Sequence, residues 1–172
     1  MIGTPEALIL YSGSSEAFAT NRPVLENLGS ARYLGADPGT AALYDVALLT
    51  AMYGMFGGVL HAIAIAATED VRATDLMELL VPWLDAMGGS LPELAEQVDA
   101  DDHPTDSPLA MQARGLASLV EASRAQGVRA DLLVPMQRLV DAGVAAGHGD
   151  EDLSSLVQLL APGSAEPVAS ED

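Results

Sequence analysis

The sequence predicts a mainly α-helical protein with a long central helix, a bundle of about five shorter helices and a short β segment at the N-terminus. Three observations predict this fold class. Residues 41–67 form one apolar run whose only charged side chain is Asp45. The segments that follow carry repeated helix start and stop signals. Finally, 49% of the residues are hydrophobic but only 4% are aromatic, so the core must consist of Ala, Leu, Val and Met, which favours closely packed helices.

The N-terminal segment reads as a strand, a helix and a second strand. We expect strands at 7–11 and 31–34, a turn at 12–15 that offers an N-cap, and a helix over 16–28. Gly29 should end this helix, and Pro23 inside it should shorten or bend it. Two strands alone are marginally stable in water, so they resemble the closing edge of a larger sheet.

The apolar run predicts an unusually long helix. Asp37 is a good N-cap and Pro38 a good first helical residue, and the next proline is Pro82, so the helix can continue to about residue 68. At ~1.5 Å per residue it would be roughly 45 Å long. An apolar surface of that length must be covered by something large.

Lipid and protein are the two possible covers. Residues 46–67 carry no formal charge, and Gly54 and Gly58 form a GxxxG pair, as in some membrane helices. However, the polar His61 and Thr50 dilute the run, and neither flank is basic, whereas membrane spans prefer Lys or Arg on one side. We therefore favour protein as the cover and expect no membrane association.

Five further helices are predicted from their caps. They are expected at 74–87 capped by Thr74, at 91–99 opened by the capping-box pattern Ser90-Leu-Pro-Glu93, at 108–126 closed by Gly127, at 132–146 capped by Asp131, and at 151–160 capped by Asp150. The small and acidic residues 162–172 read as a disordered tail.

Composition excludes several classes of function. The formal net charge is −18 and all seven basic residues are Arg, which argues against nucleic acid and against anionic membrane surfaces. The chain has no cysteine, hence no disulfide and no thiol nucleophile. The acidic stretch 99–103 reads as a solvated loop, and we expect no metal site. The N-terminus lacks a basic n-region, so a cytoplasmic location is expected.

Several pieces, in order, carry a family resemblance. The stretch YLGADPGTAALYDVALLTAMYGMFGGVLHAIAIA resembles the interdomain helix of the imine reductases and reductive aminases, NADPH-dependent relatives of the β-hydroxyacid dehydrogenases. IGTPEALILYSGS resembles the end of that family's nucleotide-binding domain, and SPLAMQARGLASLVEASRAQGV and AAGHGDEDLSSLVQLL resemble its C-terminal helices. The resemblance implies a Rossmann-type remnant over 1–36, a helical dimerisation and substrate domain over 37–161, and a homodimer whose long helices intertwine.

The same resemblance implies site residues. Asp45 and Tyr53 are separated by about 12 Å of rise and about 80° of turn on a helix, so both can face one broad cleft. The resemblance implies that Asp45 assists protonation of the imine nitrogen. It implies that Tyr53 assists this protonation or positions the substrate. Trp83, Met111 and Gln112 are implied to line the substrate pocket. The alternative is that Asp45 pairs near the helix start and Tyr53 is a half-buried packing residue. His61 is expected to be a hydrogen-bonded core residue.

Departures from the family pattern limit the prediction. The 172 residues contain no GxGxxG turn and no basic cluster for a 2′-phosphate, so most of the nucleotide domain is not among them. We therefore expect the chain alone to be inactive, whether it is a fragment, the product of a late start or an orphan. The functional expectation is the substrate-binding and dimerisation part of an imine-reducing oxidoreductase. A non-catalytic helical dimerisation module and a small membrane protein are the alternatives.

Overall fold

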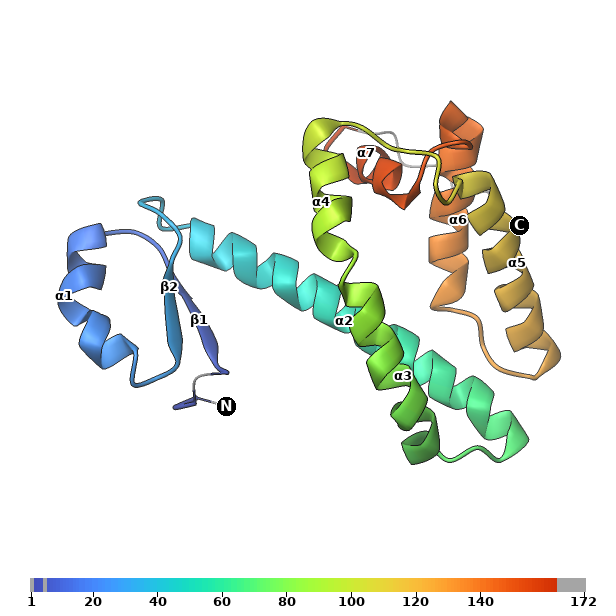
Figure 1. Cartoon of the computed structure of the whole chain (residues 1–172), viewed down its shortest axis with the longest axis horizontal. Helices are drawn as coiled ribbons and strands as arrows, with labels where there is room; N and C mark the ends of the chain where they lie inside the picture. Colours follow the sequence, from blue (N-terminus) through green and yellow to red (C-terminus); the bar gives the residue numbers. More distant parts are fainter. Residues whose placement is uncertain (1, 5, 164–172) are drawn as a thin grey trace. The chain divides into compact units, whose positions relative to one another are not determined.

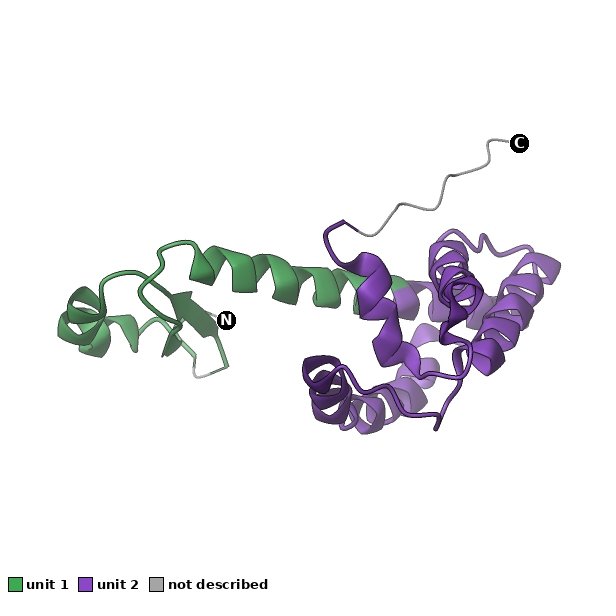
Figure 2. Cartoon of the chain, turned by 90° about the horizontal axis from the view of Figure 1, so that it is seen from above, with its two compact units in different colours: residues 1–57 green, residues 58–172 purple. Residues whose placement is uncertain are grey.

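A computed structural model describes residues 2–4 and 6–163 of the chain (Figure 1). The chain divides into two compact units, Met1–Gly57 and Gly58–Asp172, and the boundary falls within the long helix (Figure 2). In chain order the elements are β1 (Leu8–Tyr11), α1 (Ser15–Leu25), β2 (Ser30–Tyr33), α2 (Thr40–Ala66), η1 (Ala67–Glu69), α3 (Ala73–Gly88), α4 (Leu91–Ala100), α5 (Leu109–Ala125), α6 (Leu133–Gly143), η2 (Val144–His148), η3 (Leu153–Leu156) and α7 (Val157–Leu160). The mainly helical prediction is confirmed.

Unit 1 contains a β–α–β arrangement. β1 and β2 pair in parallel, with Leu8 opposite Ser30 and Tyr11 opposite Tyr33. Phe18 on α1 covers the strands, because its ring centroid lies 5.6 Å from that of Tyr11 and 5.2 Å from that of Tyr33. Parallel strands normally lie in larger sheets covered on both faces, so the pair has the character of one edge of a sheet.

The helix of unit 1 is shorter than the sequence predicted. We expected it to continue to residue 28, but α1 ends at Leu25. Beyond Pro23, the N–H groups of Asn27 and Leu28 bond to carbonyls three residues back, so the chain tightens into turns. The predicted cap in the preceding turn is confirmed, since the Ser14 hydroxyl accepts from the Ala17 N–H at 3.1 Å.

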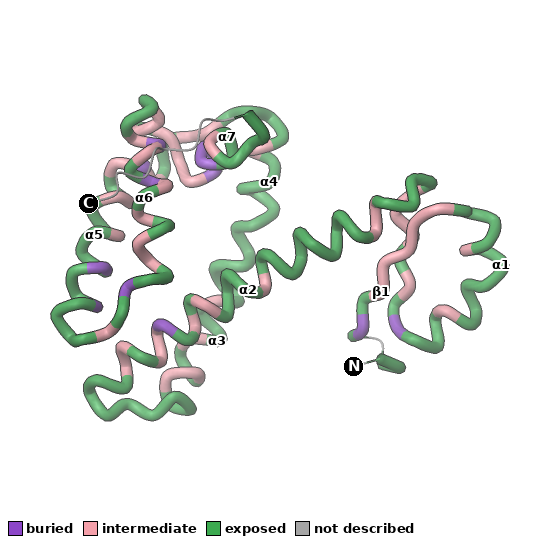
Figure 3. Tube along the Cα trace, turned by 180° about the vertical axis from the view of Figure 1, so that it is seen from behind, coloured by how far each residue is buried: buried purple, intermediate pink, exposed green. Residues whose placement is uncertain are grey.

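The long helix forms as predicted and is largely uncovered. α2 begins at Thr40, two residues after Pro38, and the Asp37 carboxylate accepts from the Gly39 N–H at 2.8 Å instead of capping the helix directly. Within α2 only His61 is buried (Figure 3). Among the described residues one helix, Thr40–Glu69 with η1 included, is long and apolar enough to span a membrane by length and composition alone.

The core of unit 2 lies where α5, α6 and η3 meet. Leu109, Val140 and Leu156 are buried against one another. Gly143 lets them approach, since a Cβ there would lie 2.8 Å from a methyl carbon of Leu156 and 3.0 Å from one of Leu109. The first turn of α5 is closed from outside the helix, because the Leu109 N–H donates to the Glu151 carbonyl at 2.8 Å. The C-terminal segment thus completes both the core and a helix end.

Two predicted caps are wrong because their side chains have other partners. α3 begins at Ala73, and the Thr74 hydroxyl contacts the Asp75 carboxylate, whose pKa is lowered by its hydrogen bonds with the Arg72 guanidinium. Ser90 precedes α4, but its hydroxyl donates backwards to the Met87 carbonyl at 2.8 Å, so the capping box does not form. Only two residues separate α3 from α4, and the hydroxyl satisfies the end of the earlier helix.

The last two predicted caps are also displaced. Asp131 pairs with the Arg129 guanidinium and does not cap α6, which begins at Leu133. Asp152, not Asp150, accepts from the N–H that opens η3, at 2.7 Å from Leu153 N. The helix predicted over 132–146 ends at Gly143 and continues as the wider turn of η2, where Gly147 has a φ of 105°. The expected tail lies outside the described residues from 164 onwards.

Two helical glycines provide a matched test of this core. Gly143→Ala should destabilise the protein by about 1–3 kcal/mol, because the added methyl group meets two buried leucines that are already packed. Gly115→Ala on α5, where nothing lies within 4 Å of the new Cβ, should stabilise by about 0.5–1 kcal/mol through helix propensity. Urea unfolding followed by circular dichroism measures both. Equal effects of the two substitutions would contradict the described packing.

Candidate functional site

Asp45 is an unpaired carboxylate on an apolar helix. It lies in the second turn of α2 and is exposed. In the described part of the chain, no hydrogen bond or ion pair reaches it. Its neighbours one turn away are Ala41, Ala42, Leu48 and Leu49, none of which can donate a side-chain hydrogen bond. The carboxylate is therefore free to meet a ligand or another chain.

Tyr53 lies two turns further along the same helix. Its side chain is 70% exposed, and its hydroxyl has no hydrogen-bond partner among residues 2–4 and 6–163. The alternative interpretation expected a half-buried packing residue, and within this chain the side chain is mostly exposed. The structure thus leaves a carboxylate and a phenol, a proton donor or acceptor and a hydrogen-bonding group, exposed on one apolar rod.

The other three predicted site residues lie on two helices of unit 2. Trp83, on α3, is 59% exposed, and Met111, in the first turn of α5, is 50% exposed. Gln112 is half-buried, and its Nε2 donates to the Ser107 hydroxyl at 2.9 Å. Among the described residues no hydrogen bond or ring contact joins Trp83 to Met111 or Gln112. Large apolar side chains left this exposed are typical of surfaces that another molecule covers.

One feature near the start of α2 was missed at the sequence level. The Ser12 hydroxyl accepts from the Ala41 N–H at 3.1 Å and donates to the Pro38 carbonyl at 3.0 Å. The sequence placed Ser12 in a turn after the first strand, and its real partners lie 26 and 29 residues later. No local pattern signals such a contact. Only the strand–helix–strand prediction, which brings the end of β1 near the end of β2, could have suggested it.

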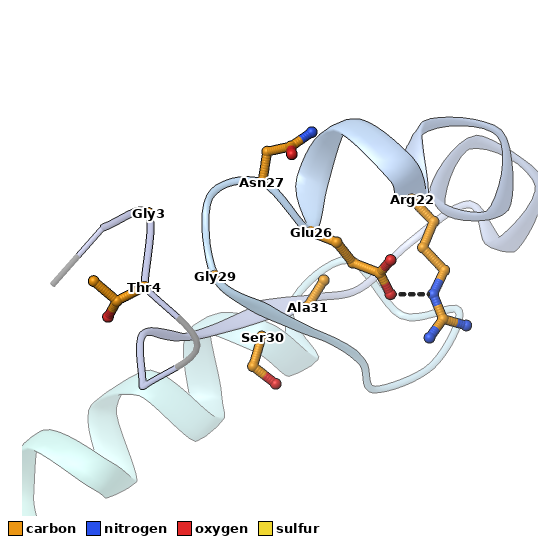
Figure 4. Close-up of a pocket in the computed structure, with 8 residues that line it drawn as sticks. All are labelled: Gly3, Thr4, Arg22, Glu26, Asn27, Gly29, Ser30 and Ala31. Atoms are coloured by element: carbon orange, nitrogen blue, oxygen red, sulfur yellow. Dashed lines mark hydrogen bonds and ion pairs between the residues drawn. The ribbon is translucent and has the colours of Figure 1, made fainter.

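A hollow of about 530 Å³ lies at the amino end of the two strands (Figure 4). Its wall includes Gly29 and Ser30 at the start of β2 and Asn27 after α1. The one guanidinium that lines it, Arg22, is held by Glu26 at 2.7 Å. The C-terminal end of a helix carries partial negative charge, so this hollow disfavours an anion. None of the five predicted site residues lines it.

A second hollow, of about 460 Å³, lies in unit 2 beside His61. The expectation that His61 is a hydrogen-bonded core residue is confirmed. It is 8% exposed, and its Nε2 lies 3.0 Å from the Ser123 hydroxyl. Ser123 itself donates to the Leu119 carbonyl, so it accepts from His61, which fixes the tautomer with the proton on Nε2. This pair joins α2 to α5 within unit 2.

The acidic stretch 99–103 is not wholly solvated. The His103 side chain is 5% exposed, and its Nδ1 lies 2.8 Å from the Ser154 hydroxyl. Its Nε2 lies 3.1 Å from the Gln158 amide, which also donates to Asp101. These contacts attach the loop after α4 to the C-terminal segment. Within the described ranges, no three His, Asp or Glu side chains gather as a metal site.

The helical part of the chain matches one protein family. The model of the C-terminal domain of NADPH-dependent reductive aminase-like proteins matches residues 37–162. The chain therefore belongs to this family.

One relative is itself named a reductive aminase. An NADPH-dependent reductive aminase of Aspergillus oryzae (strain ATCC 42149 / RIB 40) is 43% identical over 168 residues, which are 95% of this chain and 57% of the relative.

Solved structures of this family superpose closely on the chain. A reductive aminase from Aspergillus terreus in complex with NADPH and ethyl levulinate has a TM-score of 0.89 and 47% identity, covering 94% of this chain and 57% of that one. An imine reductase from the same organism, in complex with NADPH4 and dibenz[c,e]azepine, has a TM-score of 0.86 and 48% identity. The match covers 92% of this chain and 56% of that one. The chain thus spans little more than half the length of these relatives.

Proposed function

We propose that this chain is the substrate-binding and dimerisation part of an NADPH-dependent oxidoreductase that reduces imines to amines. Family membership supports the reaction class. The observation that carries the proposal is the unpaired carboxylate of Asp45 on the same helix as the exposed Tyr53. In this layout residues 1–36 are the last part of a nucleotide-binding domain and residues 37–161 are the helical domain. A cytoplasmic location goes with this function.

The residues of this chain supply the proton and the pocket. Reduction of an imine adds a hydride at carbon and a proton at nitrogen. Asp45 is the group that delivers or relays the proton to the nitrogen, and the Tyr53 hydroxyl orients the developing amine. Trp83, Met111 and Gln112 form apolar and hydrogen-bonding walls for the substrate. The relatives were solved with a keto ester and with cyclohexanone and allyl amine, so a ketone and an amine are the substrates that we propose.

The described residues do not fit a dinucleotide. The first strand-to-helix turn, Ser12-Gly13-Ser14, is not the GxGxxG type. The hollow in unit 1 lies at the amino end of the strands, whereas ligands of parallel sheets bind at the carboxyl end. Among the described residues that line this hollow, the one guanidinium, that of Arg22, is already paired with Glu26. The described residues therefore do not form an NADPH site by themselves, and we assign NADPH binding to a nucleotide-binding domain of the family type.

The proposal also includes a homodimer. Apolar side chains along α2, among them Val46, Met55, Phe56 and Leu60, are between 49% and 64% exposed. At Gly54 and Gly58 an added Cβ would meet nothing within 4 Å in this chain, so its own packing does not require glycine there. Glycine would be required there if a second backbone approached the helix at these two positions. A second copy of the chain presents the same apolar length and is the cover that we propose.

The dimer is tested by mass in solution. We expect detergent-free protein at micromolar concentration to have twice the 17.7 kDa chain mass, with a buried area well over ~2,000 Å². Phe56→Glu should shift it towards monomer, because a charge cannot be buried at the interface unpaired. Val24→Glu, at a residue that is also exposed but lies on α1, should leave the dimer intact. A wild-type monomer in sedimentation velocity, or protein found only with membranes, would refute the dimer.

Cofactor binding provides a second test. Because the described residues offer no phosphate-binding turn, the 172-residue chain should bind NADPH weakly or not at all. Isothermal titration calorimetry measures this, with the whole Aspergillus oryzae relative as the positive control. Micromolar affinity of the chain alone would mean that a nucleotide site exists within these residues, contrary to the proposal.

The proton donor is tested by substitution. With the chain joined behind the nucleotide-binding segment of the Aspergillus oryzae relative, Asp45→Asn should lower the rate of imine reduction at least ~10-fold and leave the dimer intact. Asp141→Asn, an exposed carboxylate on α6, is the control and should change neither. An unchanged rate for Asp45→Asn would remove its catalytic role. Loss of the dimer instead would favour the non-catalytic dimerisation module.

A further inference from the structure

The start of α2 is attached to the end of β1 by one side chain. The Ser12 hydroxyl uses its proton to bond the Pro38 carbonyl at 3.0 Å and its oxygen to accept the Ala41 N–H at 3.1 Å. A hydroxyl has one donor and can accept at the same time, so both bonds coexist. Ser12 therefore connects Pro38, two residues before the helix, and the first turn of the helix to the strand end.

Ser12 is itself held firmly by the backbone on both sides. The carbonyl of Tyr11 accepts from the Leu34 N–H at 2.8 Å, and the Gly13 N–H donates to the Gly35 carbonyl at 2.9 Å. The Tyr33 hydroxyl donates to the Gly13 carbonyl at 2.6 Å. These bonds continue the parallel pairing beyond Tyr11 and Tyr33. The hydroxyl of Ser12 is thus a fixed point at the carboxyl end of the two strands.

Asp45 lies one helical turn beyond the bonded amide. Four residues separate it from Ala41, which places it about 6 Å further along α2 and about 40° round it. A rotation or slide of the first turn of α2 would therefore displace the Asp45 carboxylate directly. Because proton transfer requires heavy atoms within about 3 Å, a small displacement would matter to the rate.

We infer that Ser12 is a positioning residue that fixes the Asp45 carboxylate relative to the carboxyl end of the β1–β2 pair. This inference rests on the proposed function of Asp45. The bond is not needed for the helix to form. The Thr40 N–H already bonds to the Asp37 carbonyl, and the Leu43 N–H to the Gly39 carbonyl. Ser12 fixes the position of the first turn of α2 relative to β1, whereas residues 40–66 form the helix without it.

The chain offers a matched control two residues away. Ser14 has the same hydroxyl in the same turn, but it caps α1 by accepting from the Ala17 N–H. Removing either hydroxyl removes a helix-terminal hydrogen bond. Only the removal of the Ser12 hydroxyl breaks the bonds that attach the start of α2 to the end of β1. A general loss of stability in this turn would affect both variants, whereas a positioning effect on Asp45 would affect one.

Hydrogen exchange on the chain itself tests the bond. Ser12→Ala should speed exchange of the Ala41 amide by about 5-fold, since a typical hydrogen bond stabilises by this order. Ser14→Ala should instead speed exchange at Ala17 and leave Ala41 unchanged. Ser12→Thr, which keeps the hydroxyl, should restore slow exchange at Ala41. An Ala41 amide that does not respond to Ser12→Ala would overturn the inference.

Kinetics of the joined enzyme test the positioning role. Ser12→Ala should lower kcat about 10-fold with a smaller change in KM, and Ser12→Thr should recover most of the rate. In an Asp45→Asn background, Ser12→Ala should have no further effect on kcat, because the group that it positions is gone. An equal loss in both backgrounds would show that Ser12 does not act through Asp45.

The hydrogen-exchange and kinetic experiments together distinguish failure of the proposed function from failure of the positioning inference. If Asp45→Asn alone leaves the rate unchanged, the proposed function falls and the positioning inference falls with it. If Ser12→Ala still speeds exchange of the Ala41 amide in that case, the Ser12 bond exists and the role assigned to Asp45 is what is wrong. If Asp45→Asn slows the enzyme but Ser12→Ala does not, the proposed function stands and only the positioning inference is overturned.

Discussion

The length of apolar surface on α2 is the constraint on which the rest of the structure depends. The helix buries only His61 within this chain, and its other large side chains remain in contact with solvent. At ~25 cal/mol per Å², apolar surface on this scale provides a strong driving force for association. The buried hydrogen bond between His61 and Ser123 joins the C-terminal part of α2 to α5 within unit 2. The Ser12 bonds attach the N-terminal part to the strands. The middle of the helix, which carries Tyr53 and the two glycines, has no cover of its own.

This arrangement explains why a carboxylate can sit on an apolar helix. An ionised carboxylate in a dry interface costs several kcal/mol unless it is paired, and none of the residues one turn from Asp45 can pair with it. Asp45 is tolerated because it lies near the exposed start of the helix, where water, a partner chain or a substrate can reach it. A proton-transfer role uses this property, and an apolar surrounding also suits the carbon skeleton of an imine.

The sequence predicted the fold correctly where an apolar pattern extended over many residues. It failed where a prediction depended on a single capping residue. α2 was placed to within two residues at its start, because an apolar run of that length has few alternatives. The caps at Thr74, Ser90, Asp131 and Asp150 were wrong, because hydroxyls and carboxylates at helix ends find whichever partner the tertiary structure offers. Ser90 bonds the helix before it, and Asp131 pairs with Arg129. Ser12 was missed for the same reason, since its partners lie 26 and 29 residues away. Asp45, Tyr53, Trp83, Met111 and Gln112 were named mainly through family resemblance, because no spacing rule identifies a proton donor on a single helix.

The central claim is that a second copy of the chain covers the exposed face of α2, and thiol protection measures this most directly. The sequence has no cysteine, so Met55→Cys gives a single reactive thiol near the middle of the exposed helix. The account predicts that its alkylation by iodoacetamide slows as protein concentration rises into the micromolar range. A cysteine at Asp99, exposed on α4, should react at one rate throughout. A thiol at residue 55 that reacts as fast as the one at residue 99 at every concentration would contradict the claim.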